Sequence, residues 1–274
     1  MTKKEIAGSR KGAVKTAAIP VAVLHELNKG TIESLNLTEW LAVDHMELLR
    51  NVLLDYPDHL KACEEALGDL KGLSVRTAIV EIGKVLLAVI KKSGVKENEV
   101  APLFEYLASH PSDSVRCWAV YSVGLDPELS INEKFKAMYR FAADAHFGVR
   151  ELAWMAMRED IEKHLIESIR ILMDWTSSAD ENIRRFATEA TRPRGVWCKH
   201  LQLLKAHPEM ALGLLAALKA DPSPYVQLSV GNWLNDAGKT QPEWLLSVCQ
   251  SWVKDSTNPY TLKIVKRASR NVSV

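Results

Sequence analysis

The sequence lacks several features that would each point to a particular class of protein. No apolar run reaches the roughly 20 residues that a membrane-spanning helix needs, and the basic start is not followed by the apolar segment of a signal peptide. The four cysteines are scattered and form no CxxC pair, so we expect neither a zinc site nor a disulfide framework. Unpaired thiols fit a reducing compartment, and we expect a cytoplasmic protein.

Sequence patterns for common catalytic chemistries are also missing. The eight histidines form no HExxH pattern, no glycine-rich phosphate loop is present, and no Ser/His/Asp constellation follows from spacing. Runs of β-branched residues bounded by hairpin turns are absent as well. We therefore expect no metal, no cofactor and no membrane partner, and little or no β-structure.

Net charge is small, at +1, so bulk charge does not by itself indicate a protein that binds nucleic acid. Basic side chains nevertheless gather at 1–16, at 170–205 and from 254 onward, and the middle stretch holds seven basic against four acidic residues. The sequence does not show whether these stretches share one face. Taken alone, they are explained more simply as scattered, solvated charge.

A repeated phrase runs through the chain on a background of helical periodicity. It consists of a polar or turn residue, a short gap, Val or Ile followed by Arg, and an apolar helix, and its copies begin near 73, 113, 144, 180 and 221. The last four starts are separated by 31, 36 and 41 residues, which is the period of HEAT- and armadillo-like helix pairs. The copy at 221 departs from the pattern, because Gln227 stands in place of the Arg.

This phrase predicts both a fold and the work of each residue in it. Asp or Ser at the start would cap the second helix of each pair by accepting its free N–H groups, and the Val or Ile would face the core. A single pair cannot bury its apolar face, so neighbouring pairs stack. We expect an all-α, HEAT-like helical-repeat solenoid (an α-α superhelix) with a concave face lined by second helices, and one continuous domain over residues 1–274.

Three stretches carry a more specific signal. Residues 184–197 hold an acid at Glu189, then Thr-Arg-Pro-Arg at 191–194, then Trp197; residues 229–236 read Ser-Val-Gly-Asn-Trp-Leu-Asn-Asp; and Val-Arg-Glu begins at 149. Together with residues 19–44, these stretches resemble the AlkC branch of the AlkC/AlkD-like, HEAT-repeat DNA alkylation repair glycosylases. The resemblance covers nearly the whole chain, although some members carry an additional C-terminal immunoglobulin-like domain that we do not expect here.

The resemblance implies an enzyme that hydrolyses the N-glycosidic bond of cationic alkylated bases, of the 3-methyladenine and 3-methylcytosine type, in base excision repair. It also implies double-stranded DNA containing such bases as the partner and a concave face that binds it, and we expect a monomer with no obligate protein partner. The residues that match the family's functional positions comprise the catalytic candidates Glu151, Glu189, Asp236 and Trp197, and the DNA-binding candidates Arg150, Arg185, Arg192, Arg194, Lys199 and Lys239.

The residue types suit that chemistry. A cationic base is already a good leaving group, so the protein must mainly supply negative charge near a sugar that develops oxocarbenium character, and a base that orients water. Trp197, and Trp154 as a further candidate, would pack on the deoxyribose and the cationic lesion. Arginines would hold the phosphates near the lesion.

Without the family, each residue has a plainer explanation. Glu189 lies four residues after Arg185, which is ordinary helix pairing, and Asp236 follows Asn235 where turn residues are common. Glu151 would cap a helix, and Trp197 would pack in the core. A HEAT scaffold that binds protein or DNA without catalysis, and a DNA-binding relative that has lost catalysis, therefore remain alternatives.

Overall fold

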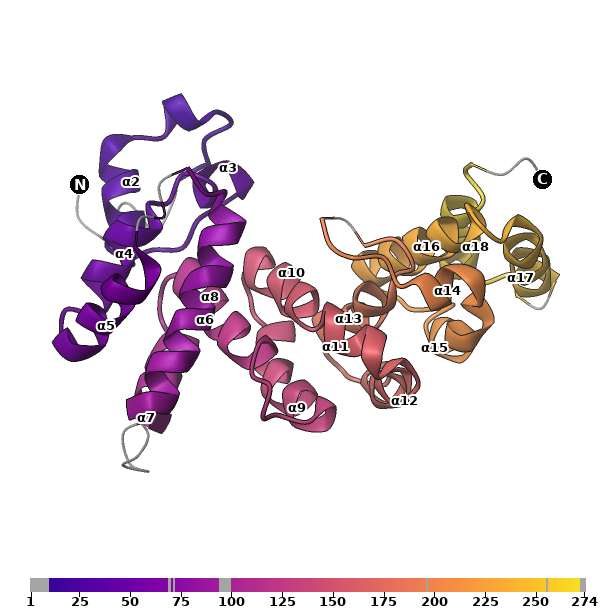
Figure 1. The fold of residues 1–274 in the computed structure, drawn as a ribbon. Helices are drawn as coiled ribbons and strands as arrows, with labels where there is room; N and C mark the ends of the chain where they lie inside the picture. The colour runs from indigo at the N-terminus through magenta and orange to yellow at the C-terminus, as the bar shows by residue number, and fades with distance from the viewer. Residues whose placement is uncertain are drawn as a thin grey trace. The chain divides into compact units, whose positions relative to one another are not determined.

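The structure is a computed structural model that describes residues 10–271 apart from 69, 71, 94–99, 196 and 255. Every regular element in the described part of the chain is helical, so the all-α fold class is confirmed (Figure 1). None of these helices is both long and apolar enough to cross a membrane. By internal packing, the chain divides into two compact units.

Unit 1 comprises residues 1–128 and 145–153. In its described part, a short 3-10 turn (Thr16–Ala18) precedes a series of helices in which α6 lies against α5, α7 and α8 (Figure 1). These helices are α2 (Val21–Asn28), α3 (Leu37–Trp40), α4 (His45–Val52), α5 (Pro57–Leu67), α6 (Val75–Ser93), α7 (Val100–Ala108) and α8 (Asp113–Gly124). Helix α10 (Phe147–Ala156) starts in this unit and continues into the other from Trp154.

Unit 2 comprises residues 129–144 and 154–274. Here α16 packs between α13 and α18, and α12 packs against α13, which places the second helices of successive pairs side by side (Figure 1). The elements are α9 (Ile131–Ala142), α11 (Arg158–Lys163), α12 (Leu165–Trp175), α13 (Glu181–Thr191), α14 (Gln202–Ala206), a 3-10 turn (Pro208–Ala211), α15 (Leu212–Ala217), α16 (Pro224–Gly238), α17 (Pro242–Lys254) and α18 (Pro259–Ala268). The helical-repeat fold is confirmed, while the single domain over 1–274 stays a prediction.

The apolar member of the repeated phrase faces the core in the last four copies, as predicted, whereas Val75 of the first copy is only half-buried. Val115, Val149, Ile183 and Val226 are all fully buried. The capping prediction holds at two copies, where Ser74 accepts from the N–H of Thr77 and Asp180 from that of Asn182. At the copy that starts at Asp221, Ser223 caps the helix instead, accepting from the N–H groups of Tyr225 and Val226. Apolar burial together with side-chain caps explains why each second helix begins where it does.

Two acids of the repeated phrase bind residues far away in the sequence. Asp113 lies inside the first turn of α8, and its carboxylate accepts from the N–H and hydroxyl of Ser34, a segment 79 residues earlier. Asp221 accepts from the N–H of Ser223 and from both Nε and NH2 of Arg184. The prediction that these two acids cap helices is wrong, because long-range partners hold their carboxylates.

The Arg of the phrase closes the loop that precedes its own helix. Arg116, Arg150 and Arg184 each donate from a guanidinium N–H to backbone carbonyls five or six residues earlier. Gln227 does the same with its amide, donating to the carbonyls of Asp221 at 2.8 Å and Pro222 at 3.3 Å. The Gln227 departure therefore keeps the loop-closing contact, since an amide N–H replaces a guanidinium N–H.

Candidate active site

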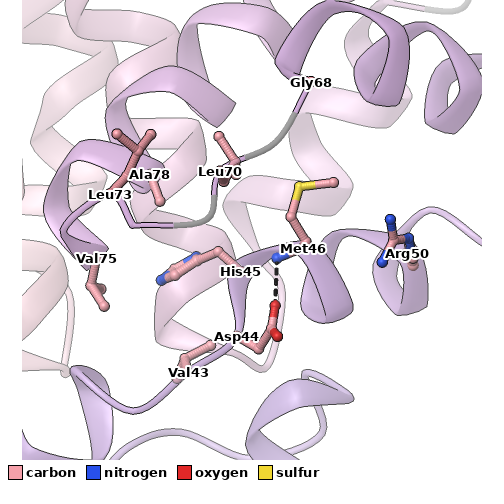
Figure 2. A pocket seen from close by; sticks show the side chains of 10 residues that line it. All are labelled: Val43, Asp44, His45, Met46, Arg50, Gly68, Leu70, Leu73, Val75 and Ala78. Atoms are coloured by element: carbon pink, nitrogen blue, oxygen red, sulfur yellow. Dashed lines mark hydrogen bonds between the residues drawn. The ribbon is translucent and has the colours of Figure 1, made fainter.

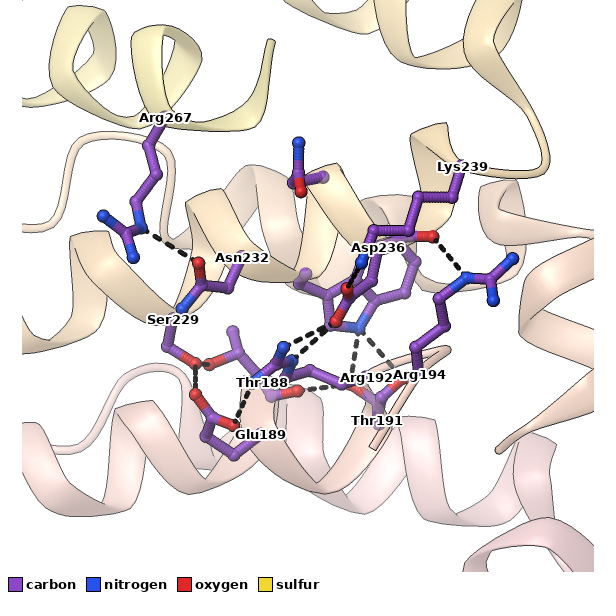
Figure 3. Close-up of polar contacts among 12 residues, drawn as sticks. Thr188, Glu189, Thr191, Arg192, Arg194, Ser229, Asn232, Asp236, Lys239 and Arg267 are labelled. Carbon is purple, nitrogen blue, oxygen red and sulfur yellow. Dashed lines mark hydrogen bonds and ion pairs between the residues drawn. The ribbon is translucent and has the colours of Figure 1, made fainter. Parts of the chain in front are cut away.

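Two carboxylates meet where α13 packs against α16. Glu189 comes from the last turn of α13 and Asp236 from the last turns of α16, and each residue is only 4% exposed (Figure 3). Burial of two acids at one helix interface is unfavourable unless cations and hydrogen bonds compensate. The surrounding side chains must therefore be accounted for one by one.

Arg192, the first residue after α13, bridges the two acids. Its Nε and NH2 donate to Oδ2 of Asp236 at 2.9 and 2.6 Å, and its NH1 donates to Oε2 of Glu189 at 3.1 Å (Figure 3). Burial alone would lower the pKa of Arg192, but the charges of Glu189 and Asp236 outweigh it and the pKa is raised. One guanidinium therefore offsets the repulsion between both carboxylates.

Each carboxylate also has a second set of partners. Oε1 of Glu189 accepts from the hydroxyl of Ser229 at 2.7 Å and lies 3.5 Å from NH2 of Arg185. Oδ1 of Asp236 accepts from Nζ of Lys239 at 2.9 Å. The cluster thus consists of two carboxylates, each held by its own hydrogen bonds, and three cations, Arg185, Arg192 and Lys239. The two acids are fixed in position on adjacent helices.

The loop after α13 is held by an arginine that the sequence did not single out. Arg158 of α11 is 2% exposed and donates to three backbone carbonyls, those of Lys199 and Ala190 at 2.8 Å each and that of Arg192. Burial lowers the pKa of Arg158 to about 10, so it remains a cation near neutral pH. No local pattern marks this residue, because its partners lie 32 to 41 residues away in the sequence.

The same loop presents Trp197. The N–H of Leu201 donates to the carbonyl of Pro193 at 3.1 Å and closes the loop at its base. Trp197 is 66% exposed and has a φ of 60°, in the left-handed region that non-glycine residues seldom occupy. The core-packing explanation for Trp197 is therefore wrong. Trp154, in contrast, is 2% exposed and is buried inside the fold, so it offers no surface for stacking on a substrate.

The structure brings together six of the predicted site residues. Glu189, Asp236, Arg185, Arg192 and Lys239 form the cluster, and Nε of Arg194 donates to the backbone carbonyl of Asp236 at 3.3 Å. Lys199 instead pairs with Glu162 at 2.7 Å, and hydrogen bonding to that carboxylate raises the pKa of Lys199.

Two further predicted residues belong to unit 1. Glu151 and Arg150 belong to the part of α10 that lies in unit 1, and NH1 of Arg150 donates to the carbonyl of Ala145 at 2.7 Å. That contact gives Arg150 the loop-closing role of the repeated phrase. The catalytic role of Glu151 and the DNA-binding role of Arg150 stay predictions.

A hollow of about 610 Å³ in unit 1 is a different kind of site (Figure 2). Its acid, Asp44, caps α4 by accepting from the N–H of Met46. Its histidine, His45, accepts from Nε1 of Trp118 at 3.2 Å, and burial lowers the pKa of His45 to about 4 although Asp44 opposes the shift. The imidazole is therefore neutral near pH 7, and the Asp44 carboxylate and Nδ1 of His45 are both held by hydrogen bonds within the fold.

Comparison with known proteins points to one family. Residues 149–261 match the sequence profile of the family described as DNA alkylation repair enzyme. The uncharacterized protein YhaZ of Bacillus subtilis (strain 168) is 36% identical over 142 residues, which are 51% of this chain and 37% of YhaZ. Glu189, Asp236 and the bridging Arg192 all fall inside the matched profile.

Solved structures show a similar fold. The Pseudomonas fluorescens alkylpurine DNA glycosylase AlkC, solved bound to DNA containing an abasic site analog, superposes with a TM-score of 0.64 at 26% identity, covering 93% of this chain and 65% of that one. AlkD2 from Streptococcus mutans superposes with a TM-score of 0.53 at 23% identity, covering 73% of this chain and all of that one. The chain thus spans about a third of YhaZ and two thirds of AlkC, and the AlkC/AlkD-like resemblance recognised in the sequence is confirmed.

Proposed function

We propose that this chain, which combines the alkylation-repair sequence signature with an AlkC-like helical-repeat fold, is a DNA glycosylase that hydrolyses the N-glycosidic bond of cationic alkylated bases. Lesions of the 3-methyladenine and 3-methylcytosine type in double-stranded DNA are its substrates, and base excision repair is its process. The observation that carries this proposal is the pair of buried carboxylates, Glu189 and Asp236, bridged by Arg192 within the matched region.

Hydrolysis of the N-glycosidic bond of a cationic base needs little more than a pair of fixed carboxylates. A base that already carries positive charge leaves without protonation, and the deoxyribose becomes cationic as the bond lengthens. Carboxylates fixed in position before the reaction stabilise that charge without reorganising at the moment of bond cleavage. One of the two acids also accepts a proton from the attacking water. Arg192 keeps both acids in place in the absence of DNA.

Trp197 supplies the aromatic surface in this proposal. Its exposed indole, on a loop held by Arg158, packs on the deoxyribose and on the cationic lesion. Attraction between a cation and an indole face contributes roughly 0.5–2 kcal/mol. The phosphates near the lesion are bound by cations of unit 2. The candidates are Arg185, Arg194 and Lys239, which contact residues of the carboxylate pair, and Lys199, which pairs with Glu162.

The test is release of free methylated base from a methylated duplex under single-turnover conditions. We expect release by the wild type and a loss of about 100-fold or more in Glu189→Gln and in Asp236→Asn, the size seen when one preorganised charge-stabilising group is removed. Glu243→Gln is the matched control, because Glu243 is exposed on α17 and lies outside the cluster.

Parallel measurements of DNA binding separate this function from its alternatives. A wild type that binds DNA but releases no base would be a DNA-binding relative without catalysis. A wild type that does neither would be a protein-binding scaffold. Unchanged release in both acid variants would remove Glu189 and Asp236 from the chemistry.

A further inference from the structure

A basic groove lies between α16 and α18 in unit 2. It is a hollow of about 400 Å³ whose lining includes Leu228 and the four cations Lys263, Lys266, Arg267 and Arg270, with no carboxylate among the lining residues. All four cations come from α18 or the turn that follows it. The sequence showed these residues only as a basic stretch near the end of the chain.

Close packing of two helices forms the groove. At Gly231 of α16, a Cβ atom would lie 2.9 Å from the Cβ of Arg267, so only glycine allows α18 to approach this closely. Buried Thr261, Ile264 and Ala268 anchor α18 from its inner face. The basic side chains are thereby left on the outer face, at the spacing of one helix stripe.

Hydrogen bonds orient the two arginines without neutralising them. Nε of Arg267 donates to Oδ1 of Asn232 at 2.9 Å (Figure 3), and NH1 of Arg270 donates to the backbone carbonyl of Arg267 at 2.7 Å. Within the described residues, none of the four cations pairs with a carboxylate. Burial and then repulsion from Arg267 lower the pKa of Arg270. Like charges held together without a counter-charge favour an anionic ligand.

The groove and the carboxylate cluster share helix α16. Gln227 lines the groove and Asp236 lies nine residues further along the same helix, which at 1.5 Å per residue is about 13 Å. Arg270 is close enough to Asp236 and Arg192 for both charges to act on its pKa. A span of about 13 Å corresponds to roughly four base-pair steps of 3.4 Å.

We propose that this groove is a phosphodiester subsite that holds the DNA backbone a few nucleotides from the lesion. This inference rests on the proposed function, since DNA is the polyanion that the neighbouring site would engage. Four cations in a groove whose lining includes no carboxylate match a chain of phosphates. The exposed Leu228 lies beside them and packs against the sugar edge.

The test is the salt dependence of binding to a lesion-free duplex, compared between Lys263→Gln/Lys266→Gln and the wild type. Both lysines are exposed, so the double variant should fold normally. Each phosphate contact contributes about −0.9 to the slope of log K against log salt, so we expect the slope of the double variant to be less negative by about 2 and its binding at low salt to be weaker. Lys61→Gln/Lys136→Gln removes the same charge from exposed positions elsewhere and should leave the slope unchanged.

A second variant adds charge instead of removing it. Leu228 is 41% exposed, and Leu228→Glu places an anion in the groove, with Leu228→Gln as its uncharged control. We expect Leu228→Glu to weaken binding to the lesion-free duplex and Leu228→Gln to leave that binding unchanged. Slopes and affinities equal to those of the controls in both experiments would overturn the proposal.

The two proposals fail in different ways. Normal base release by a Lys263→Gln/Lys266→Gln protein that binds DNA like the wild type would reject the subsite and leave the glycosylase standing. A wild type without base release, whose DNA binding still weakens in the double variant, would reject the glycosylase and leave the subsite.

Discussion

Removal of the Arg158 guanidinium tests whether one buried cation holds the loop that carries Arg192 and Trp197. Arg158→Met keeps most of the side-chain volume but leaves the carbonyls of Ala190, Arg192 and Lys199 without their donor. Hydrogen bonds from a charged donor contribute roughly 1.5–3 kcal/mol each, and a buried carbonyl left without a donor costs roughly 1–3 kcal/mol. Loss of the buried charge itself relieves a desolvation cost, so we expect a net loss of about 3–5 kcal/mol.

The assay is urea unfolding followed by tryptophan fluorescence, with the transition of unit 2 fitted separately from that of unit 1 if the two do not coincide. Arg158→Lys keeps the charge but lacks the planar set of donors, so it should fall between Arg158→Met and the wild type. Arg170→Met is the control, because Arg170 is exposed on α12, and should stay within about 0.5 kcal/mol of the wild type. A loss below about 1 kcal/mol in Arg158→Met would refute the anchoring role.

Three further predictions follow from particular contacts. Gly83→Ala would place a Cβ atom 2.6 Å from Cβ of Tyr121 and 2.8 Å from the carbonyl of Trp118, so thermal unfolding should show unit 1 destabilised by about 1–3 kcal/mol. His45 has a folded-state pKa of about 4 against 6.5 when unfolded, so stability should be full above pH 6.5 and fall by about 3 kcal/mol as pH drops to 4. His45→Asn should flatten that dependence in denaturation measured across pH. Trp197→Ala should leave unfolding unchanged, since the side chain is 66% exposed, but slow single-turnover base release by about 2- to 30-fold.

Much of the fold was predictable because it depends on local patterns. Val or Ile at a fixed place in the repeat is buried in every one of the copies from 113 onward, and Asp180 and Ser223 cap their helices as their residue types favour. Asp113 shows the limit of this reasoning. Its partner, Ser34, lies 79 residues away, and a long-range hydrogen bond outweighed the local capping preference.

The candidate site was predictable for a different reason. Glu189, Arg192 and Asp236 were found through a resemblance, and the structure supplies what spacing could not, namely that one guanidinium touches both acids. Arg158 was missed because nothing in its neighbourhood marks a buried anchor. The groove cations were visible as charge, but only the packing of α18 against Gly231 shows that they line a groove on α16, the helix that also carries Asp236.

Single-turnover release of methylated base from an alkylated duplex, by the wild type beside Asp236→Asn, tests the central claim most directly. DNA affinity is measured on the same samples, so that a binding defect is not mistaken for a chemical one. We predict release by the wild type and a loss of about 100-fold or more in the variant, with DNA binding retained. Equal release rates for the two proteins would contradict the assignment of the Glu189–Asp236 pair as the catalytic centre.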